Sequence, residues 1–282
     1  MNAKGIASSF KLLSIYLNPE MWTSVQFLFS GPMETVIDLK MEGGVGWARS
    51  LMSQQKAYKI SCPKCDRIAE VMLYEAINVD THPQLKDDLM RNRLNAVICE
   101  ICEFSFRIDK PLLYNDPTRN WMVYWLPLSG HDFERGEAEF RKLLGEMTAM
   151  MPNDMHVPEF HLVFTRTELV ERIFLREAGL NERVIEYVKH MIYTKNLKKL
   201  NPKDKDLLFN AEDSTPEKLV FVVQDVESRS LESIFEYDRS AYKALCEMFD
   251  DDNQTATLLE LFPGPHLSAR RLFLQESRVR EL

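Results

Sequence analysis

The feature that most constrains this sequence is a pair of Cys-x-x-Cys motifs, Cys62-Pro63-Lys64-Cys65 and Cys99-Glu100-Ile101-Cys102, with 33 residues between them. Two residues between cysteines let a tight turn direct both sulfur atoms at one point, and two such turns form the tetrahedral thiolate site that zinc prefers. The gap exceeds the ~15–20 residues of a plain zinc ribbon, but a strand and a helix fit within it. We therefore predict that Cys62, Cys65, Cys99 and Cys102 bind one metal ion.

Three interpretations of this motif pair compete. Structural zinc is favoured, because a small β-rich domain needs an additional cross-link for stability and zinc ligation contributes on the order of 10–16 kcal/mol to folding. Iron in a rubredoxin-like site is the second, since four thiolates also suit iron. A dithiol redox centre is the third, although the second cysteine pair and the lack of a βαβ pattern around the first weaken it.

Charge and hydropathy restrict the class of protein further. Residues 52–130 carry equal numbers of basic and acidic side chains, so the net charge of −8 arises in 131–282. A nucleic-acid binder usually has a basic face, and the neutral cysteine region disfavours that role. No apolar run is long enough to cross a bilayer, and no secretion signal is evident. We expect a cytoplasmic protein without a membrane segment, in which paired cysteines remain reduced.

The order of the expected elements predicts an α+β protein in which a zinc-ribbon-like β domain precedes an acidic α+β domain. Residues 1–51 show no sustained period, and Met52 resembles a natural start, so the segment is interpreted as a poorly ordered extension rather than a docking segment. The predicted organisation is an N-terminal extension at 1–55, the ribbon domain at 56–130, an amphipathic helix and linker at 131–157, the α+β domain at 158–250, and a C-terminal tail at 251–282.

Periodicity and turn signals locate the elements within these domains. A capping box at Thr165 and Glu168 predicts a helix start. In the ribbon domain we expect strands at 57–61, 70–79, 94–98, 104–109 and 121–126, and a short helix from Pro83 to Met90. Beyond it we expect helices at 132–150, 165–178, 184–192 and 242–249, and strands at 160–164, 207–209 and 219–223.

The cysteine region resembles a known family, the CpXC domain proteins, a bacterial group without assigned function. The resembling residues include Cys62-Pro63-Lys64-Cys65, Leu94-Asn95, Cys99-Glu100-Ile101-Cys102 and the stretch from Pro111 to Pro127. The resemblance implies metal binding through the four cysteines. The sequence departs from a common knuckle pattern, because Asp66 and Glu103 stand where glycine often follows the second cysteine. Aspartate tolerates the left-handed conformation better than glutamate does.

Other candidate sites are weaker. Tyr114, Asn115 and Asp116 with Trp121, Tyr124 and Trp125 could line a cleft, but a turn and a core strand explain them better. Lys189, Lys195, Lys198, Lys199, Lys203 and Lys205 form a basic stretch that could contact nucleic acid, although lysines at a helix C-terminus also complement its dipole. His156 and His161 match no metalloprotease motif, and Cys246 fits an apolar helix face.

The sequence thus favours a metal-stabilised binding or adaptor module that engages a protein partner. A nucleic-acid-binding zinc ribbon is the alternative, and a thiol-redox or rubredoxin-like iron protein is the third reading. No nucleophile–base pair or open metal position is evident, which favours a role other than catalysis.

Overall fold

A computed structural model describes residues 23–26, 52–128, 132–149, 151 and 156–280, without the side chains of 23–26, 253 and 276–280. The chain divides into two compact units. The N-terminal unit, Pro19–Leu169, contains all four motif cysteines, and the described part of the C-terminal unit begins at Val170. The mixed helix and strand content confirms the α+β prediction. The expectation that residues 1–51 form a poorly ordered extension lies mostly outside the described residues.

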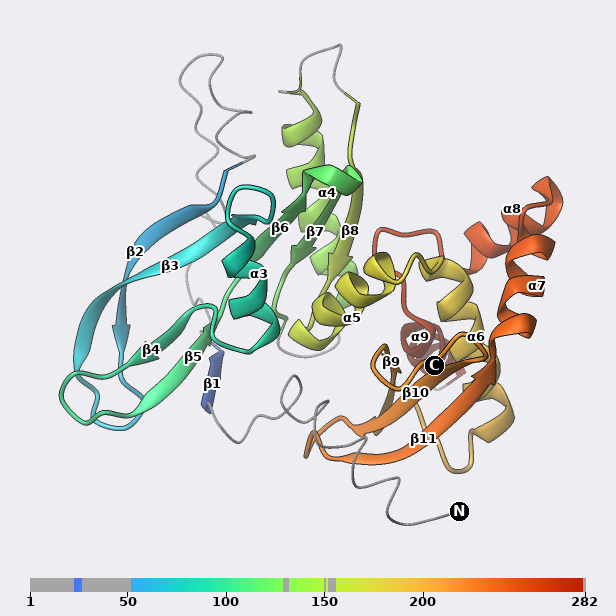
Figure 1. The fold of residues 1–282 in the computed structure, drawn as a ribbon. Helices are drawn as coiled ribbons and strands as arrows, with labels where there is room; N and C mark the ends of the chain where they lie inside the picture. The colour runs from blue at the N-terminus through green and yellow to red at the C-terminus, as the bar shows by residue number, and fades with distance from the viewer. Residues whose placement is uncertain (1–22, 27–51, 129–131, 150, 152–155, 281–282) are drawn as a thin grey trace. The chain divides into compact units, whose positions relative to one another are not determined.

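The N-terminal unit is built on a mixed five-stranded sheet with the strand order β2-β3-β6-β7-β8 (Figure 1). Pairs β2–β3 and β6–β7 are antiparallel, whereas β3–β6 and β7–β8 are parallel. The strands are β2 (Gln54–Ser61), β3 (Ile68–Asn78), β6 (Leu112–Asp116), β7 (Trp121–Trp125) and β8 (Glu159–Val163).

Helices cover this sheet on both faces. In the view of Figure 1, α3 (Pro83–Met90) lies in front of it and α4 (Phe133–Ala149) behind it. Because side chains alternate along a strand, one set of residues from β6, β7 and β8 faces α4. The core between α4 and the sheet consists of Ala76, Leu113, Met122, Tyr124, Leu126, Phe140, Met147, Leu162 and Phe164.

A second, three-stranded sheet in this unit has the order β1-β5-β4. Strand β4 (Ala96–Ile98) pairs antiparallel with β5 (Ser105–Asp109), and β1 (Thr23–Gln26) pairs parallel with β5. Strand β5 leads into β6, and Pro117–Arg119 form a short 3-10 helix between β6 and β7. The two hairpins that carry the cysteines, β2–β3 and β4–β5, therefore belong to different sheets.

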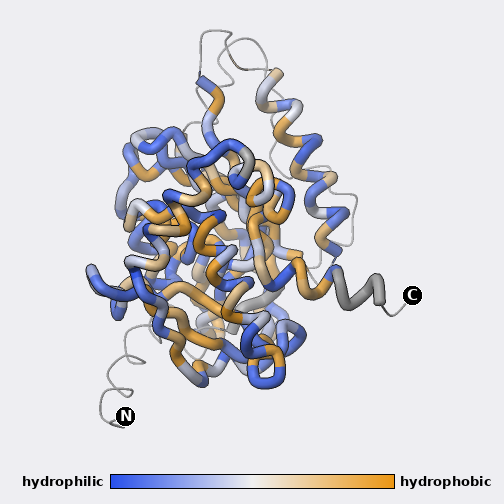
Figure 2. Tube along the Cα trace, turned by 90° about the vertical axis from the view of Figure 1, so that its right-hand side faces the viewer, coloured by the Kyte–Doolittle hydropathy of each residue, from blue (hydrophilic) through white to orange (hydrophobic). Residues whose placement is uncertain are grey.

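The C-terminal unit packs helices against an antiparallel sheet with the order β11-β10-β9. The strands are β9 (Lys205–Asn210), β10 (Lys218–Asp225) and β11 (Leu231–Asp238). The helices are α5 (Arg166–Glu177), which begins in the N-terminal unit, α6 (Glu182–Asn196), α7 (Arg239–Phe249), α8 (Asp252–Leu261) and α9 (Ala269–Arg280). Hydrophobic colouring gathers along interior segments of the chain trace, and hydrophilic colouring is common along its outer turns (Figure 2).

The observed elements differ from the sequence-based organisation in several places, among them strands β1, β6 and β11, which the sequence did not predict. Strand β8 pairs with β7 and α4 packs on the same sheet, so the sheet extends well beyond the boundary expected at residue 130. The segment expected to be a tail, 251–282, contains α8 and α9, and Leu258, Phe262 and Leu267 from this segment are buried in the core of the C-terminal unit. Apolar burial of this size explains why both helices are ordered parts of the fold.

Candidate metal centre

The first cysteine pair forms the turn that joins β2 to β3. Two backbone hydrogen bonds close the turn: the Cys62 amide donates to the Arg67 carbonyl at 2.9 Å, and the Asp66 amide donates to the Cys62 carbonyl at 2.9 Å. Asp66 has a φ of 57°, in the left-handed region that aspartate enters more readily than most residues. The Lys64 amide lies 3.5 Å from Cys62 Sγ, so the turn directs a backbone dipole at the sulfur.

The second cysteine pair repeats this turn between β4 and β5. The Cys99 amide donates to the Phe104 carbonyl at 3.0 Å, and the Glu103 amide donates to the Cys99 carbonyl at 2.9 Å. Glu103 has a φ of 56°. The absence of proline and of glycine therefore does not alter the turn, and both motifs form the same knuckle.

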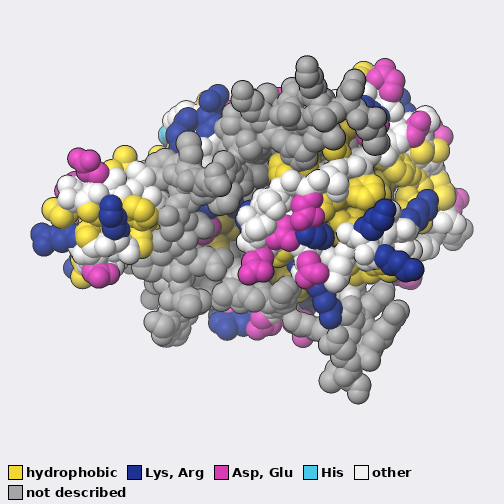
Figure 3. All heavy atoms as spheres, turned by 90° about the horizontal axis from the view of Figure 1, so that it is seen from below, with side chains coloured by type: hydrophobic (Ala, Val, Ile, Leu, Met, Phe, Trp, Pro, Cys, Tyr) yellow, Lys and Arg dark blue, Asp and Glu magenta, His cyan; other side chains and the backbone are white. Residues whose placement is uncertain are grey.

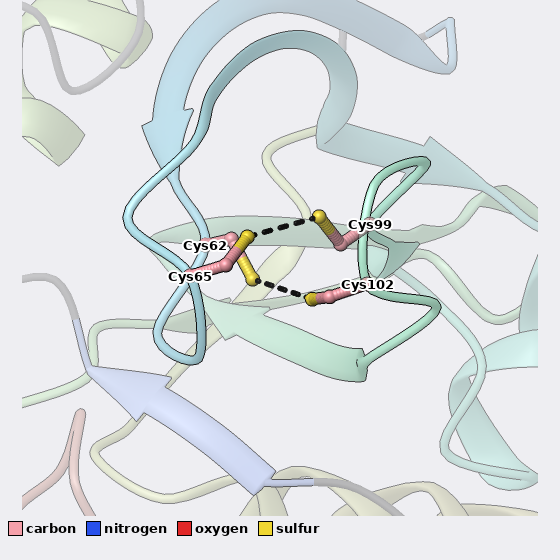
Figure 4. A group of neighbouring side chains, drawn as sticks. All are labelled: Cys62, Cys65, Cys99 and Cys102. Carbon is pink, nitrogen blue, oxygen red and sulfur yellow. Dashed lines mark hydrogen bonds between the residues drawn. The ribbon is translucent and has the colours of Figure 1, made fainter.

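All four sulfur atoms converge between the two knuckles (Figure 4). Cys62 Sγ lies 3.6 Å from Cys102 Sγ, and Cys65 Sγ lies 3.6 Å from Cys99 Sγ. All four lie within 4.8 Å of one another. A tetrahedral ion with Zn–S bonds of about 2.3 Å requires sulfur–sulfur separations of roughly 3.8 Å. The four cysteines can therefore hold one metal ion with little adjustment.

The knuckle amides and the neighbouring thiols set the electrostatics of the site. Backbone hydrogen bonds from Cys102 and Ile101 lower the pKa of Cys99 to about 6. The Arg67 amide also acts to lower the pKa of Cys65, but desolvation and hydrogen bonds with the other three thiols raise it to about 12. Because thiolates this close repel one another, one cysteine ionises easily and another resists. A divalent cation bound at the centre would favour the ionised form of all four thiols.

The site lies at the end of a small apolar cluster. Cys62 and Cys99 are buried, whereas Cys65 is exposed. Both hairpins contribute apolar side chains next to the buried cysteines. The cluster consists of Ile60, Cys62, Leu73, Cys99, Phe106 and Ile108, with Tyr58, Val71, Val97, Cys102 and Phe104 packed at its margin. So few side chains make a marginal core without an additional cross-link.

The surface around the knuckles carries charges of both signs. The hairpin end at the left of Figure 3 presents lysine or arginine, acidic and hydrophobic side chains together. Its exposed charged residues are Lys59, Lys64, Arg67, Asp66, Glu70, Glu100 and Glu103. Three isoleucines are unusually exposed: Ile68 at 67%, Ile98 at 63% and Ile101 at 67%. The knuckles thus expose apolar surface rather than a basic face.

The weaker sequence candidates do not form a second site. Tyr114, Asn115 and Asp116 lie buried in strand β6 and not in the expected turn, whereas Trp121, Tyr124 and Trp125 are buried in β7, as expected for a core strand. Cys246 lies in α7 of the C-terminal unit, outside the four-cysteine group.

The lysine stretch is not a continuous basic surface. Lys189 is buried, with its Nζ 2.7 Å from Glu171 and 3.0 Å from Glu186. Lys205 pairs with Asp225 at 2.8 Å and also with Glu232. The sequence could not reveal these pairings, because most of the partners lie far away along the chain.

Together, the fold and site define an α+β protein with a four-cysteine centre built from two equivalent knuckles. Residues 60–189 match the family described as CpXC protein, a span that includes both knuckles and most of the five-stranded sheet. This part of the chain, residues 60–189, therefore matches the CpXC family. No curated protein and no solved structure matches it. Among the described residues, no helix has the length and apolar character needed to span a membrane.

Proposed function

We propose that Cys62, Cys65, Cys99 and Cys102 hold one zinc ion and that the zinc is structural. The observation that carries this proposal is the convergence of four sulfur atoms, all within 4.8 Å, from two turns of the same geometry. A ligand set of four cysteines leaves no position for water or substrate, which is typical of structural zinc and not of catalytic zinc.

The metal's role follows from the construction of the hairpins. The apolar cluster between them is small, and four thiolates at its end would repel one another without a cation. Binding free energy at such a site is folding free energy. We expect zinc to hold the two hairpins together, with the positive charges of Lys64 and Arg67 offsetting part of the site's negative charge.

Metal analysis of three single-cysteine variants tests this proposal. Purified full-length protein should contain one zinc per chain, and Cys62→Ser and Cys99→Ser should lower zinc content and melting temperature together. Cys246→Ser is the matched control, and it should keep its zinc. Intact zinc and normal stability in Cys99→Ser would mean that the second knuckle does not bind the metal, and the proposal would be wrong.

The same preparation separates zinc from the other two interpretations. A rubredoxin-like iron centre would give a coloured protein with thiolate-to-iron absorption, and metal analysis would find iron. A dithiol redox centre would give metal-free protein that reversibly forms a disulfide. Because a thiolate zinc site requires reduced cysteines, the proposed compartment is a reducing one, the cytosol.

We further propose that the knuckles engage a protein partner. The support is the exposure of three isoleucines near the knuckles, Ile68, Ile98 and Ile101, beside mixed charges, because large exposed apolar side chains rimmed by polar residues are characteristic of protein interfaces. A nucleic-acid partner would instead require a basic face.

Paired surface variants test the partner proposal. A protein that co-purifies with the wild type should be lost from Ile98→Ser and Ile101→Ser with zinc content unchanged. It should be retained by Met248→Ser, which alters a similarly apolar exposed residue, 41% exposed, in the C-terminal unit. Retention by all three variants, or co-purification of nucleic acid alone, would overturn the proposal.

A further inference from the structure

The two cysteine hairpins need a connection that fixes their positions relative to each other. Each hairpin has one knuckle at its tip, and the two hairpins belong to different sheets. Among the described strands, no β-ladder joins β2–β3 to β4–β5. The apolar cluster between them supplies attraction, but apolar contact is non-directional and does not by itself set a register.

Asn95 supplies a directional connection between the hairpins. The Tyr74 amide of β3 donates to Asn95 Oδ1 at 2.8 Å, and Asn95 Nδ2 donates to the Tyr74 carbonyl at 3.1 Å. Strand β6 pairs with β3 only from Ala76 onward. The side-chain amide of Asn95 therefore provides both hydrogen bonds that a neighbouring strand would otherwise make with Tyr74.

The backbone of Asn95 is held at the same time. Its carbonyl accepts a hydrogen bond from the Ile108 amide of β5 at 3.1 Å, and its φ is 58°. Asparagine combines tolerance of the left-handed region with a donor and an acceptor on one side chain. Asn95 precedes β4 directly and stands four residues before Cys99. Its contacts with Tyr74 therefore fix the position of the start of the second hairpin relative to β3.

We propose that Asn95 is a positioning residue for the metal centre: its amide aligns the second knuckle with the first before the ion binds. This inference rests on the proposed metal-binding function. Both knuckles must come within bonding distance of one ion. If the start of β4 is no longer aligned with β3, the bound ion must itself order the two hairpins. The ordering cost then appears as weaker metal binding.

A buried ion pair provides a second connection but at a different point. Lys110, which follows β5, donates from Nζ to Glu75 of β3 at 3.0 Å, and Tyr58 of β2 also donates to Glu75. Burial lowers the pKa of Lys110. This pair joins the far end of β5 to the sheet, whereas Asn95 acts at the start of β4, on the strand that leads into Cys99. The two connections are therefore not equivalent for the second knuckle.

Metal titration of Asn95 variants tests the inference. Metal-free full-length protein is titrated with cobalt(II), whose thiolate absorption reports tetrahedral four-sulfur coordination, and zinc affinity is then measured by competition. Asn95→Gly keeps the left-handed backbone and removes both side-chain hydrogen bonds. Asn95→Asp is nearly isosteric, but it replaces the donor with a charged acceptor that faces the Tyr74 carbonyl. Asn120→Gly, at another left-handed and exposed asparagine in the same unit, is the control.

We expect Asn95→Gly to keep the cobalt spectrum but to bind cobalt and zinc on the order of tenfold to a hundredfold more weakly, the effect of losing two hydrogen bonds. Asn95→Asp should also be weakened, and Asn120→Gly should match the wild type. A purely structural role would lower the stability of metal-free and metal-loaded protein equally and leave affinity unchanged. An unchanged affinity in Asn95→Gly or in Asn95→Asp, whichever of them folds, would overturn the inference. Failure of the wild type to bind either ion would instead overturn the proposed function.

Discussion

Asp66 and Glu103 adopt the same backbone conformation at the same position of two different turns, with φ values of 57° and 56°. Each amide donates a hydrogen bond of 2.9 Å to the carbonyl of the first cysteine in its own knuckle. The conformation is therefore imposed by the turn and not chosen by the side chain. Glutamate is the less suited of the two residues to it.

This relationship predicts unequal effects of glycine at the two positions. Glu103→Gly should raise the free energy of unfolding by about 0.5–1 kcal/mol, because relief of left-handed strain outweighs the added entropy of the unfolded chain. Asp66→Gly should change it by less. Denaturant titration of the metal-loaded proteins measures both values, and a destabilised Glu103→Gly would contradict the prediction.

Two glycines of α4 should respond in opposite directions to alanine. A Cβ added at Gly136 would lie 2.4 Å from Phe164 Cε1 and 2.8 Å from Leu128 Cδ1, whereas a Cβ at Gly145 would meet nothing within 4 Å. Gly136→Ala should therefore destabilise by about 1–3 kcal/mol through overpacking. Gly145→Ala should stabilise by roughly 0.5–1 kcal/mol through helix propensity. Melting temperatures of both variants check this, and equal shifts would show that α4 is not held closely against the sheet.

Lys189 should be essential to the C-terminal unit although its sequence neighbours are surface lysines. Its ammonium group is buried between Glu171 and Glu186, and Glu186 also accepts the Ala269 amide at the start of α9. Lys189→Met removes the cation shared by two buried carboxylates, of which Glu186 keeps Arg172 at 2.8 Å, and should cost about 3 kcal/mol. Lys198→Met, at an exposed position, should stay within about 0.5 kcal/mol of the wild type. Comparable losses in the two variants, measured by urea unfolding, would contradict the burial of Lys189.

Acid should weaken the turn between β10 and β11. The Lys205 side chain, the Ser228 amide and the Ser228 hydroxyl all donate to Asp225 and hold its pKa well below its usual range. A carboxylate with a depressed folded-state pKa stabilises the protein above its unfolded pKa of about 3.9, and this stabilisation is lost as the pH falls further.

A comparison of the wild type with Asp225→Asn isolates this contribution. The wild type should be the more stable protein at pH 6, and the difference in unfolding free energy should shrink as the pH falls below about 4. Acid also protonates metal-binding thiolates, but both proteins share that loss and it cancels in the difference. A difference that stays constant between pH 6 and pH 3 would show that Asp225 is not ionically paired in solution.

Local patterns in the sequence predicted the parts of the structure that depend on neighbouring residues. The spacing of the four cysteines predicted their convergence. The predicted capping box is confirmed, because the Glu168 amide bonds Thr165 Oγ1 at 3.1 Å and the Thr165 amide bonds the Glu168 carboxylate at 3.1 Å. Most expected strands and helices are present close to their predicted positions.

Features that depend on distant partners could not be predicted in this way. The burial of Lys189 requires Glu171, on a different helix. Helix α9 is rich in charge and reads as a tail, yet the Ala269 amide at its start reaches the buried Glu186 carboxylate. Strand β11 has no fully buried residue and half of its residues are exposed, so burial gives little reason for a strand there, and its place is decided by pairing with β10.

Strand β3 belongs to two structures at once. Its first residues pair only with β2 in the hairpin that carries Cys62 and Cys65, and its last residues, from Ala76 to Asn78, pair with β6 inside the five-stranded sheet. The first cysteine hairpin therefore cannot be separated from the five-stranded sheet, as an independent zinc ribbon could be, because the cut would divide the continuous strand β3. During evolution, the metal centre and the sheet would have to be inherited, lost or recombined together.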